Sequence, residues 1–555
     1  MTIFFSFLTS AYKKHDDATD QRDANVDLMC DTKNVVGFDV VIVCTSNQSS
    51  EDYWQKRLEG SEGVIPKSSK VVAVHEDWEG GAGNGLGTLY AFHKAAKQYK
   101  GGDLLGEMRS GRISVGLYHT AGKGTRLAPL PGSECNNKPG VKLPGIVMVD
   151  GEKESITILE SVIRQTGLYA SVRKGRLSVF WGDQIFVPTK DISSSKPTHH
   201  ADILAMLGSF PSAEEWKKRG LEKYGLILVN DKGNASQVEK VSHDTASELL
   251  KDMGKMVSAG TSLGSFSVSH EMLDELLTEF KSEIGAKKGK LDTDPHFWMP
   301  LTLPKDGYAS LMERKGTKRE DALKHWSRMQ EFAKRFDSKK SVFPSSHLLG
   351  AVDVGNTPYW WDYGQLKYYI ANNLKLTDTS SEESNAMRRF FHVSSKSCVS
   401  GDLKLSEGSV ALSSSIRTGH AKGCVLVNCN IGHLEAENSV LVNVTAPIVK
   451  IKDQGVVYNV SETSKSLDFE DGDVVVDVCI PDESSKKGDL KFVRMFSHKD
   501  LCGGKQWKLK TKGNPFTFEE IYLRNQSSDI SHAVKLVKLR RQNSNDAMEK
   551  SNFSK

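Results

Sequence analysis

Short apolar runs alternate with helical patterns over the first third of the chain. Four runs have the length and the β-branched content expected of buried strands, and they cover 40–44, 71–74, 113–118 and 177–181. Helical periodicity lies between them, over 51–58 and 88–97 and in the stripe of Ile156, Leu159, Val162 and Ile163. Strands that alternate with helices predict an α/β fold with a mixed, mainly parallel sheet.

A different pattern begins after residue 395. Three segments, 408–412, 423–427 and 438–442, recur at a spacing of 15 residues, and each begins at a turn-forming Gly or Asn before a β-prone run. One coil of a stacked β-solenoid would give this spacing, and a set of plain antiparallel strands is the alternative. Further on, Asp471-Gly472 lies between two β-prone runs and predicts a hairpin.

These patterns divide the 555-residue chain into five parts, in keeping with a length at which several domains are expected. Polar, charged composition predicts disordered tails at both ends. The expected parts are a disordered tail over 1–30, an α/β catalytic domain over 31–395, a β-solenoid over 396–480, a β/α element over 481–540 and a second disordered tail over 541–555.

Composition narrows the possible partners and compartments. The net charge of +4 is small for this length, so neither nucleic acid nor an anionic membrane is an expected partner. The eight cysteines form no C-x-x-C pair, which favours reduced thiols over a disulfide framework or a zinc site. His199, His200 and His296 lack partners at ligand spacing and are interpreted as ordinary loop residues. No apolar run reaches membrane-spanning length, and we expect a cytoplasmic protein.

The strongest chemical signal is a glycine loop that directly follows the predicted strand 113–118. It reads His119-Thr-Ala-Gly-Lys-Gly-Thr-Arg126. Backbone N–H groups at such a strand exit can bind phosphates, because glycine lets the backbone approach closely. Arg126 adds a fork of hydrogen-bond donors. From these residues alone, a tight turn without a ligand is the alternative.

Two carboxylates could hold a metal ion. Asp183 follows the predicted strand 177–181, where a side chain points into the crevice in which α/β sheets bind ligands. Asp362 lies in Tyr359-Trp-Trp-Asp-Tyr-Gly-Gln365, which could also be an aromatic core segment with a turn. Carboxylates from two distant segments suit Mg²⁺, which prefers oxygen ligands.

Together, these segments resemble the sugar-1-phosphate nucleotidyltransferases (nucleotide-sugar pyrophosphorylases). The family's G-x-G-T-R-L-x-P-L…K-P motif is matched by 122–130 and Lys138-Pro139, its W-x-D-x-G-Q segment by 360–365, and its Y-G-V…E-K segment by 224–240. The loop departs from the family at Thr120-Ala121-Gly122, where Ala-Gly-Gly is usual, and the sugar-contacting Asn is absent from 259–264.

The resemblance implies a Rossmann-like nucleotidyltransferase domain that uses Mg²⁺ to join a nucleoside triphosphate and a sugar 1-phosphate, its two partners, with release of pyrophosphate. Lys142 lies close enough in sequence to compete with Lys138 for the catalytic role. The implied residues are Arg126 and Lys138 for catalysis; Gly85, Gly87, Thr88, Ala121, Gly122, Gly124 and Thr125 for the nucleotide; Glu239 and Lys240 for the sugar phosphate; and Asp183 and Asp362 for the metal.

The order of the motifs points to a subfamily. The segment 83–91, which resembles the family's base-contacting segment, precedes the glycine loop here, as in the fucose-1-phosphate guanylyltransferases. This order favours GTP over UTP. Two alternatives stay open: a relative that binds nucleotide sugars for regulation without turnover, and a solenoid acyltransferase that uses His420 or His433. Homo-oligomers assembled through the solenoid are a further expectation.

Overall fold

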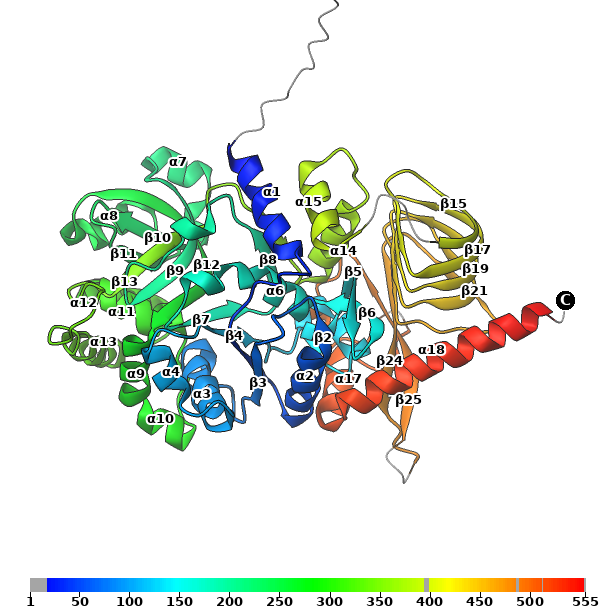
Figure 1. Ribbon diagram of the computed structural model, residues 1–555, viewed down its shortest axis with the longest axis horizontal. Coiled ribbons are helices and arrows are strands. Elements are labelled where there is room, and N and C mark those ends of the chain that lie inside the picture. Colours follow the sequence, from blue (N-terminus) through cyan, green and yellow to red (C-terminus); the bar gives the residue numbers. More distant parts are fainter. Residues whose placement is uncertain (1–16, 394–398, 486–488, 512, 554–555) are drawn as a thin grey trace, which may run out of the picture.

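The computed structural model describes residues 17–393, 399–485, 489–511 and 513–553. An α/β region, residues 17–393, lies beside a stack of parallel strands that is coloured yellow to orange in Figure 1. The last helix, α18 (Ile530–Phe553), contacts both parts, since it packs against helix α2 of the α/β region and strand β21 of the stack.

A nine-stranded sheet forms the centre of the α/β region. Its main path runs β11-β10-β12-β7-β4-β1-β3, and β9 joins β12 to β13. Strands β3, β1, β4 and β7 are parallel neighbours, whereas β12 is antiparallel to β7, β9 and β10. The predicted α/β class with a mixed sheet is therefore confirmed. The strands are β1 (Val40–Thr45), β3 (Lys70–His75), β4 (Val115–His119), β7 (Arg176–Trp181), β9 (Ala201–Ser209), β10 (Gly225–Asn230), β11 (Ala235–Glu239), β12 (Met256–Ser269) and β13 (Leu349–Asp353).

Strand β1 shows why the centre of this sheet is apolar along its whole length. All six of its residues are buried. Val41 and Val43 belong to the core cluster that contains Trp54 of α2, whereas Ile42 and Cys44 belong to the cluster that contains Leu86 of α3. Successive side chains of a strand point to opposite faces, so helices on both faces require apolar residues at every position.

Smaller sheets and the helices complete the α/β region. A two-stranded ribbon joins β8 (Gln184–Val187) and β14 (Tyr359–Asp362), and a three-stranded sheet joins β2 (Ser61–Glu62), β5 (Lys142–Val149) and β6 (Glu152–Thr157). The helices are α1 (Asp17–Cys30), α2 (Gln48–Gly60), α3 (Gly83–Gln98), α4 (Leu104–Arg109), α5 (Leu130–Ser133), α6 (Ile158–Thr166), α7 (Ala213–Lys218), α8 (His243–Leu249), α9 (His270–Glu279), α10 (Lys281–Ala286), α11 (Met299–Thr302), α12 (Lys305–Arg314), α13 (Arg319–Lys334), α14 (Leu366–Lys375) and α15 (Glu382–Phe390).

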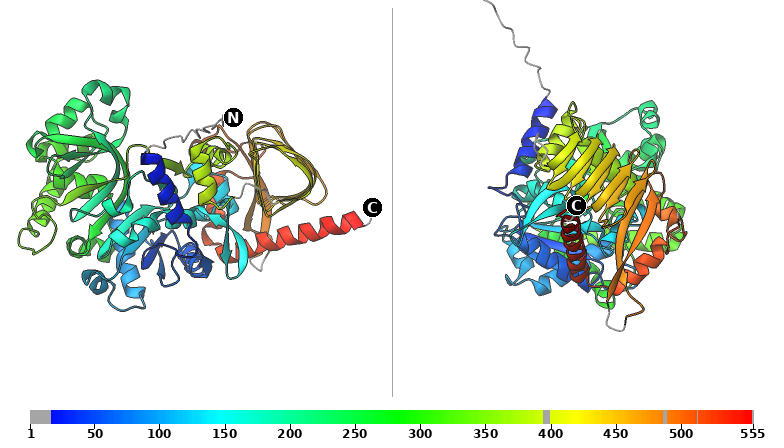
Figure 2. Two further views of the ribbon diagram at one scale, coloured as in Figure 1. Left: turned by 45° about the horizontal axis from the view of Figure 1, so that its top comes forward. Right: turned by 90° about the vertical axis from the view of Figure 1, so that its right-hand side faces the viewer.

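The stack has a solenoid-like arrangement, in which successive strands alternate between two parallel sheets (Figure 2). Val410 pairs with Val425, and Val425 with Val440, so the 15-residue spacing of the sequence is the step from coil to coil. These parallel pairings rule out plain antiparallel strands. One sheet contains β15 (Val399–Leu405), β17 (Ser414–Lys422), β19 (Asn430–Glu437), β21 (Thr445–Ile451) and β23 (Ser466–Phe469); the other contains β16 (Val410–Leu412), β18 (Val425–Val427), β20 (Val440–Val442), β22 (Val456–Tyr458), β24 (Asp473–Pro481) and β25 (Leu490–His498).

One corner of the coils carries a row of asparagines that meets the rest of the molecule. Asn428, Asn443 and Asn459 each follow a strand of the second sheet and adopt left-handed backbone conformations, with φ of 52°, 55° and 54°. Asparagine tolerates this conformation better than most residues. The Asn428 amide donates to Ser155 Oγ at 3.0 Å, and the Asn459 amide donates to Glu134 Oε1 at 2.8 Å. The corner row therefore docks the stack on the α/β region.

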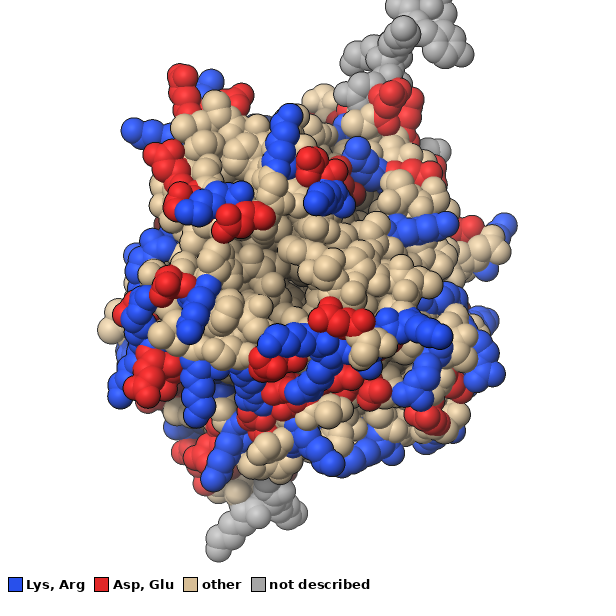
Figure 3. Space-filling model, turned by 90° about the vertical axis from the view of Figure 1, so that its left-hand side faces the viewer, with Lys and Arg blue, Asp and Glu red and all other residues tan. Residues whose placement is uncertain are grey.

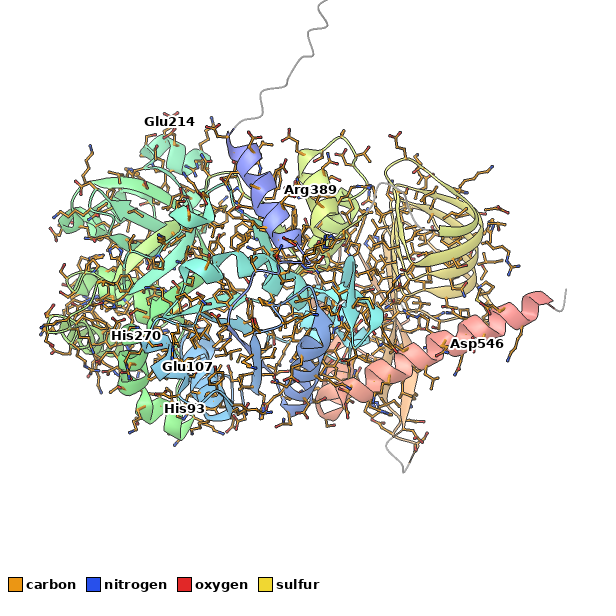
Figure 4. The ribbon with its side chains drawn as sticks, in the orientation of Figure 1. His93, Glu107, Glu214, His270, Arg389 and Asp546 are labelled. Carbon is orange, nitrogen blue, oxygen red and sulfur yellow. The ribbon has the colours of Figure 1, made fainter. Side chains whose placement is uncertain are left out.

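Both predicted disordered tails contain helices, so that prediction is wrong for residues 17–30 and 541–553; residues 1–16 and 554–555 lie outside the described part of the chain. Helix α1 is held by remote contacts: Asn25 donates to Pro188 O at 2.8 Å, and Arg389 of α15, labelled in Figure 4, pairs with Asp23 and Asp27. At the other end, the Ile530 N–H of α18 donates to Ser49 Oγ at 2.8 Å. Polar composition alone does not reveal such long-range contacts.

The hairpin predicted at Asp471-Gly472 is also wrong. The strands on either side of it, β23 and β24, lie in different sheets, so the turn connects one sheet of the stack to the other. The antiparallel partner of β24 is instead β25, which then leads to α16 (Gly503–Gln506) and α17 (Phe518–Arg524).

Two features of the whole molecule bear on its partners. Within the described ranges, no helix combines the length and the apolar content needed to cross a membrane. Seen from the end opposite the stack, the α/β region is hollowed near its centre, and charged side chains surround a largely uncharged floor (Figure 3).

Candidate functional site

The glycine loop leaves the carboxyl end of β4, as the sequence predicted, and passes close to Lys138. Gly124 has a φ of 68°, and a Cβ placed on it would lie 3.2 Å from the Cβ of Lys138 and 3.1 Å from Pro131 Cγ. A side chain at this position would thus be strained and crowded. Gly122 and Arg126 are exposed, and nothing lies within 4 Å of a Cβ added to Gly122. The loop therefore presents open backbone and a guanidinium to solvent.

The two predicted metal ligands, Asp183 and Asp362, are neighbours in space. Strand β14 ends at Asp362, which pairs with Gln184 at the start of β8, so Asp183 lies directly beside this pair. A Cβ added to Gly364 would lie 2.8 Å from Asp183 Oδ2 and 3.0 Å from Asp362 Oδ1. Both carboxylates therefore flank the same glycine, although 179 positions separate them in the numbering.

Two cations face this carboxylate pair. The Lys138 ammonium lies 2.5 Å from Asp183 Oδ2, and both side chains are mostly buried. Burial raises the pKa of the Asp362 carboxyl, and the Asp183 carboxylate adds to the rise, while Arg126 and Lys138 oppose it. Arg126, Lys138, Asp183 and Asp362 thus form one electrostatic cluster, hereafter the carboxylate site.

The carboxylate site suits a hard cation that the protein and a phosphate ligand share. The described residues contain no group of three or more His, Cys, Asp or Glu arranged to hold a metal ion by themselves. Mg²⁺ commonly takes one or two carboxylates and fills its remaining positions with substrate phosphates and water. Asp183 and Asp362 supply that donor set, and they lie beside a loop with open backbone N–H groups.

Lys142, the competitor of Lys138, lies elsewhere. Its ammonium pairs with Glu134, a carboxylate that also accepts hydrogen bonds from Tyr458 and Asn459 of the stack. The Lys142 backbone N–H donates to the Tyr458 hydroxyl at 2.9 Å. Burial lowers the pKa of Lys142, and Glu134 opposes that shift. Lys142 therefore belongs to the contact between the α/β region and the stack.

The segment predicted to contact the base begins helix α3, and its residues serve different purposes. The Gly85 N–H donates to Leu291 O at 2.8 Å, and a Cβ on Gly85 would lie only 2.9 Å from that oxygen, so Gly85 is needed for chain packing. Buried Thr88 lies 2.8 Å, Oγ1 to Nε2, from His119. Gly87 lies between Glu76 and His119, because an added Cβ would be 2.7 Å from Glu76 Oε2 and 3.6 Å from His119 Cε1.

Sequence reasoning missed Glu76. It follows β3, just as Asp183 follows β7, so the same strand-end argument could have found it. Its Oε1 accepts the Ala82 N–H at 2.9 Å, and the described residues offer it no ion-pair partner. Burial raises the pKa of the Glu76 carboxyl, against the hydrogen bond from Ala82. Glu76 is thus a half-buried acceptor at the carboxyl edge of the sheet.

Glu239 ends strand β11 and Lys240 follows it, and the strand register brings both residues to the same edge. Glu239 pairs with Gly225 of β10, whose neighbour Leu226 pairs with Thr261 of β12. Strand β12 meets β7 only from Phe266 onward, so residue 261 lies beyond the carboxyl end of β7. In the described residues Glu239 pairs with Lys240 at 3.2 Å and with Lys315, and neither contact joins it to the carboxylate site.

The geometry thus brings Arg126, Lys138, Asp183 and Asp362 together, adds Glu76 near Gly87, and separates Lys142 from them. Comparison with protein-family models and with curated proteins finds no match to this chain. The function must therefore be inferred from the chemistry of the site.

Proposed function

We propose that this chain is a Mg²⁺-dependent sugar-1-phosphate nucleotidyltransferase. The observation that carries the proposal is the convergence of Arg126 and Lys138 with Asp183 and Asp362 beside an open glycine loop. Two cations and two carboxylates at one point suit a reaction between two phosphate-bearing substrates, because both substrates are anions that must be held close together. Rossmann-like nucleotidyltransferase architecture and a true β-solenoid are the finer fold assignments that accompany this proposal.

In the proposed reaction, an oxygen of the sugar phosphate attacks the α-phosphorus of the triphosphate in line. A new P–O bond forms there while the bond from that phosphorus to the β-phosphate oxygen breaks, and pyrophosphate leaves. No general base is required, because the attacking oxygen is already an anion at pH 7. Mg²⁺ held by Asp183 and Asp362 would supply charge neutralisation for both substrates.

The protein's own residues would position and neutralise these phosphates. Gly122 leaves the loop backbone open to the triphosphate, Gly124 lets the loop pass close to Lys138, and the Arg126 fork can hold two phosphate oxygens. Lys138 can move from Asp183 to the α-phosphate oxygen that gains charge during attack. Glu239 and Lys240, at the same sheet edge, are the proposed contacts of the sugar phosphate.

Glu76 supports a guanine nucleotide as the substrate. The Watson–Crick edge of guanine presents two adjacent N–H donors, whereas uracil flanks its single N–H with two carbonyl oxygens that a carboxylate would repel. Glu76 Oε2 is the acceptor beside Gly87, whose lack of a side chain lets the carboxylate approach the start of α3 closely. The proposed triphosphate is therefore GTP.

The test is release of pyrophosphate from each of the four nucleoside triphosphates with a panel of sugar 1-phosphates and Mg²⁺. We expect release with GTP, and we expect Asp183→Asn and Asp362→Asn to lower the rate by about 10²–10³. Asp244→Asn, on a side chain that is 95% exposed, is the matched control and should leave the rate unchanged. Absence of release with every pair would favour a non-catalytic relative that binds nucleotide sugars.

A further inference from the structure

A cavity of about 300 Å³ lies where the α/β region, the stack and helix α18 meet. Its wall includes Arg57 and Lys142 of the α/β region, Asn443 of the corner row, and Lys538 and Arg541 of α18. Lys138, Asp183 and Asp362 are not among the lining residues, so the cavity is separate from the carboxylate site. Its volume is at the lower end of the range for pockets that hold small molecules.

Most of the charges around this cavity neutralise one another. Arg57 donates two hydrogen bonds, of 2.8 and 3.0 Å, to the Glu160 carboxylate. Lys142 pairs with Glu134, as described above. The exposed Lys538 pairs with Glu154 at the rim. Lys538 also lies 3.6 Å from Glu152, so each of the wall carboxylates Glu134, Glu152 and Glu154 has a cationic partner.

Arg541 is the less exposed of two wall cations without an ion pair among the described residues, the other being the exposed Lys153. No carboxylate of the described residues lies within ion-pair distance of it, and its Nη1 donates to the neutral Asn443 Oδ1. Burial lowers the pKa of the Arg541 guanidinium, and Glu154 opposes the shift only through longer-range attraction. A largely buried cation without a counter-ion is unfavourable, and an anion that entered the cavity would remove that penalty.

We propose that this cavity binds a small phosphorylated metabolite through Arg541. The planar guanidinium offers parallel N–H donors that match two phosphate oxygens. Lys538 lies three residues before Arg541 and hence on the same side of α18, where it keeps the rim carboxylates Glu152 and Glu154 paired and leaves Arg541 for the phosphate. Asn443 and Asn545 add amide groups to the wall, which suit the hydroxyl groups of such a metabolite.

Because of the position of the cavity, a bound ligand would contact both α18 and the stack. The wall contains both α18 and Asn443, so a bound phosphate would bridge the helix to the corner row of the stack. Figure 2 shows α18 running along the side of the stack, where Arg540 pairs with Asp477 of β24 and Thr445 of β21 donates to Asn545. Occupancy should therefore stabilise the attachment of α18.

Inorganic phosphate is the probe, with binding measured by calorimetry and by the thermal midpoint. Wild-type protein should bind phosphate, and Arg541→Gln should weaken that binding by about tenfold to a hundredfold, the value of a hydrogen bond to a charged group. Lys535→Gln removes an exposed cation from the same helix outside the cavity and should bind as wild type. Equal binding by wild type and Arg541→Gln would overturn the proposal.

Two further measurements separate this site from the carboxylate site and from a folding defect. Arg126→Gln should lose phosphate contacts at the glycine loop but keep the Arg541-dependent binding, whether or not the chain proves to be a nucleotidyltransferase. In wild-type protein, phosphate should slow amide hydrogen exchange in residues 530–545, which needs no variant to fold. Unchanged exchange there at saturating phosphate would contradict the proposal.

Discussion

The Lys138 ammonium lies 2.5 Å from Asp183 Oδ2, so the proposed catalytic cation rests on a proposed metal ligand. This pairing neutralises a mostly buried lysine while no substrate is bound. In the proposed reaction, Asp183 would hold Mg²⁺, and Lys138 would then be available to contact a phosphate oxygen. The ion pair therefore holds Lys138 and Asp183 at the positions in which the proposed reaction would use them.

Replacing each of the two competing lysines should give opposite results. Lys138→Met should lower the rate of pyrophosphate release by about 10²–10³ and destabilise the fold less than Lys142→Met, because Asp183 is less buried than Glu134. Lys142→Met should instead lower the free energy of unfolding by about 3 kcal/mol, because it leaves the Glu134 carboxylate buried without its cation. Rates and urea unfolding of both variants check this, and the reverse pattern would assign catalysis to Lys142.

Replacing Glu76 should change the choice of base. Glu76→Gln should lower kcat/KM for GTP by about tenfold to a hundredfold and change the value for UTP much less, because the carboxylate acceptor is lost. Competition assays with the two triphosphates measure this ratio, and Glu79→Gln, an exposed neighbour, is the control. An equal loss for both triphosphates would mean that Glu76 only supports the loop through Ala82.

His119 should make stability depend on pH. Burial lowers its pKa to about 4, below the ordinary value of 6.5, so the unfolded chain binds the proton more readily. Stability should therefore fall as the pH falls from 6.5 towards 4, and His119 should contribute up to about 2 kcal/mol of the loss between pH 7 and pH 5. Urea unfolding at the two pH values should show a smaller loss in His119→Gln. The exposed His532→Gln should leave the loss unchanged.

The hydroxyl of Tyr458 should contribute measurably to the free energy of unfolding, because it joins the stack to the α/β region. It donates to Glu134 and accepts the Lys142 N–H. Tyr458→Phe leaves both groups without this partner and should lower the free energy of unfolding by about 1–3 kcal/mol. Denaturant unfolding measures the change, with Tyr368→Phe on an exposed side chain as control. A loss no larger than that of the control would place the main contact elsewhere.

The sequence predicted those parts of the fold whose cause is local. The apolar run of β1 and the 15-residue spacing from Val410 to Val425 and Val440 both reflect repeated burial, which leaves a periodic pattern. The next step, from Val440 to Val456, is 16 residues long, and the 15-residue spacing did not predict it because this coil has one extra residue. Helices α1 and α18 were not predicted, because the residues that they contact are remote in sequence, as Pro188 is from Asn25.

The sequence predicted which residues of the candidate site lie together only where those residues belong to one continuous segment. The neighbouring positions of Gly124 and Lys138 follow from one continuous segment, whereas Asp183 and Asp362 were placed together by resemblance and not by any local pattern. A lone acidic residue such as Glu76 carries no pattern of its own. Its place beside Gly87 depends on how β3 and α3 pack, which only the assembled sheet reveals.

The asparagine corner row limits how this protein could change in length. A whole extra coil inserted between Asn428 and Asn459 would preserve the stacking but shift each later corner by one strand spacing, about 4.8 Å. Asn459 would then miss Glu134, and the carboxylate that balances Lys142 would lose a donor. The same insertion ahead of Ser414 would leave all three corners in place. An added coil there would displace Gly408 from Arg388, which donates to its carbonyl oxygen at 2.6 Å, so extension by design at this end must replace that one hydrogen bond.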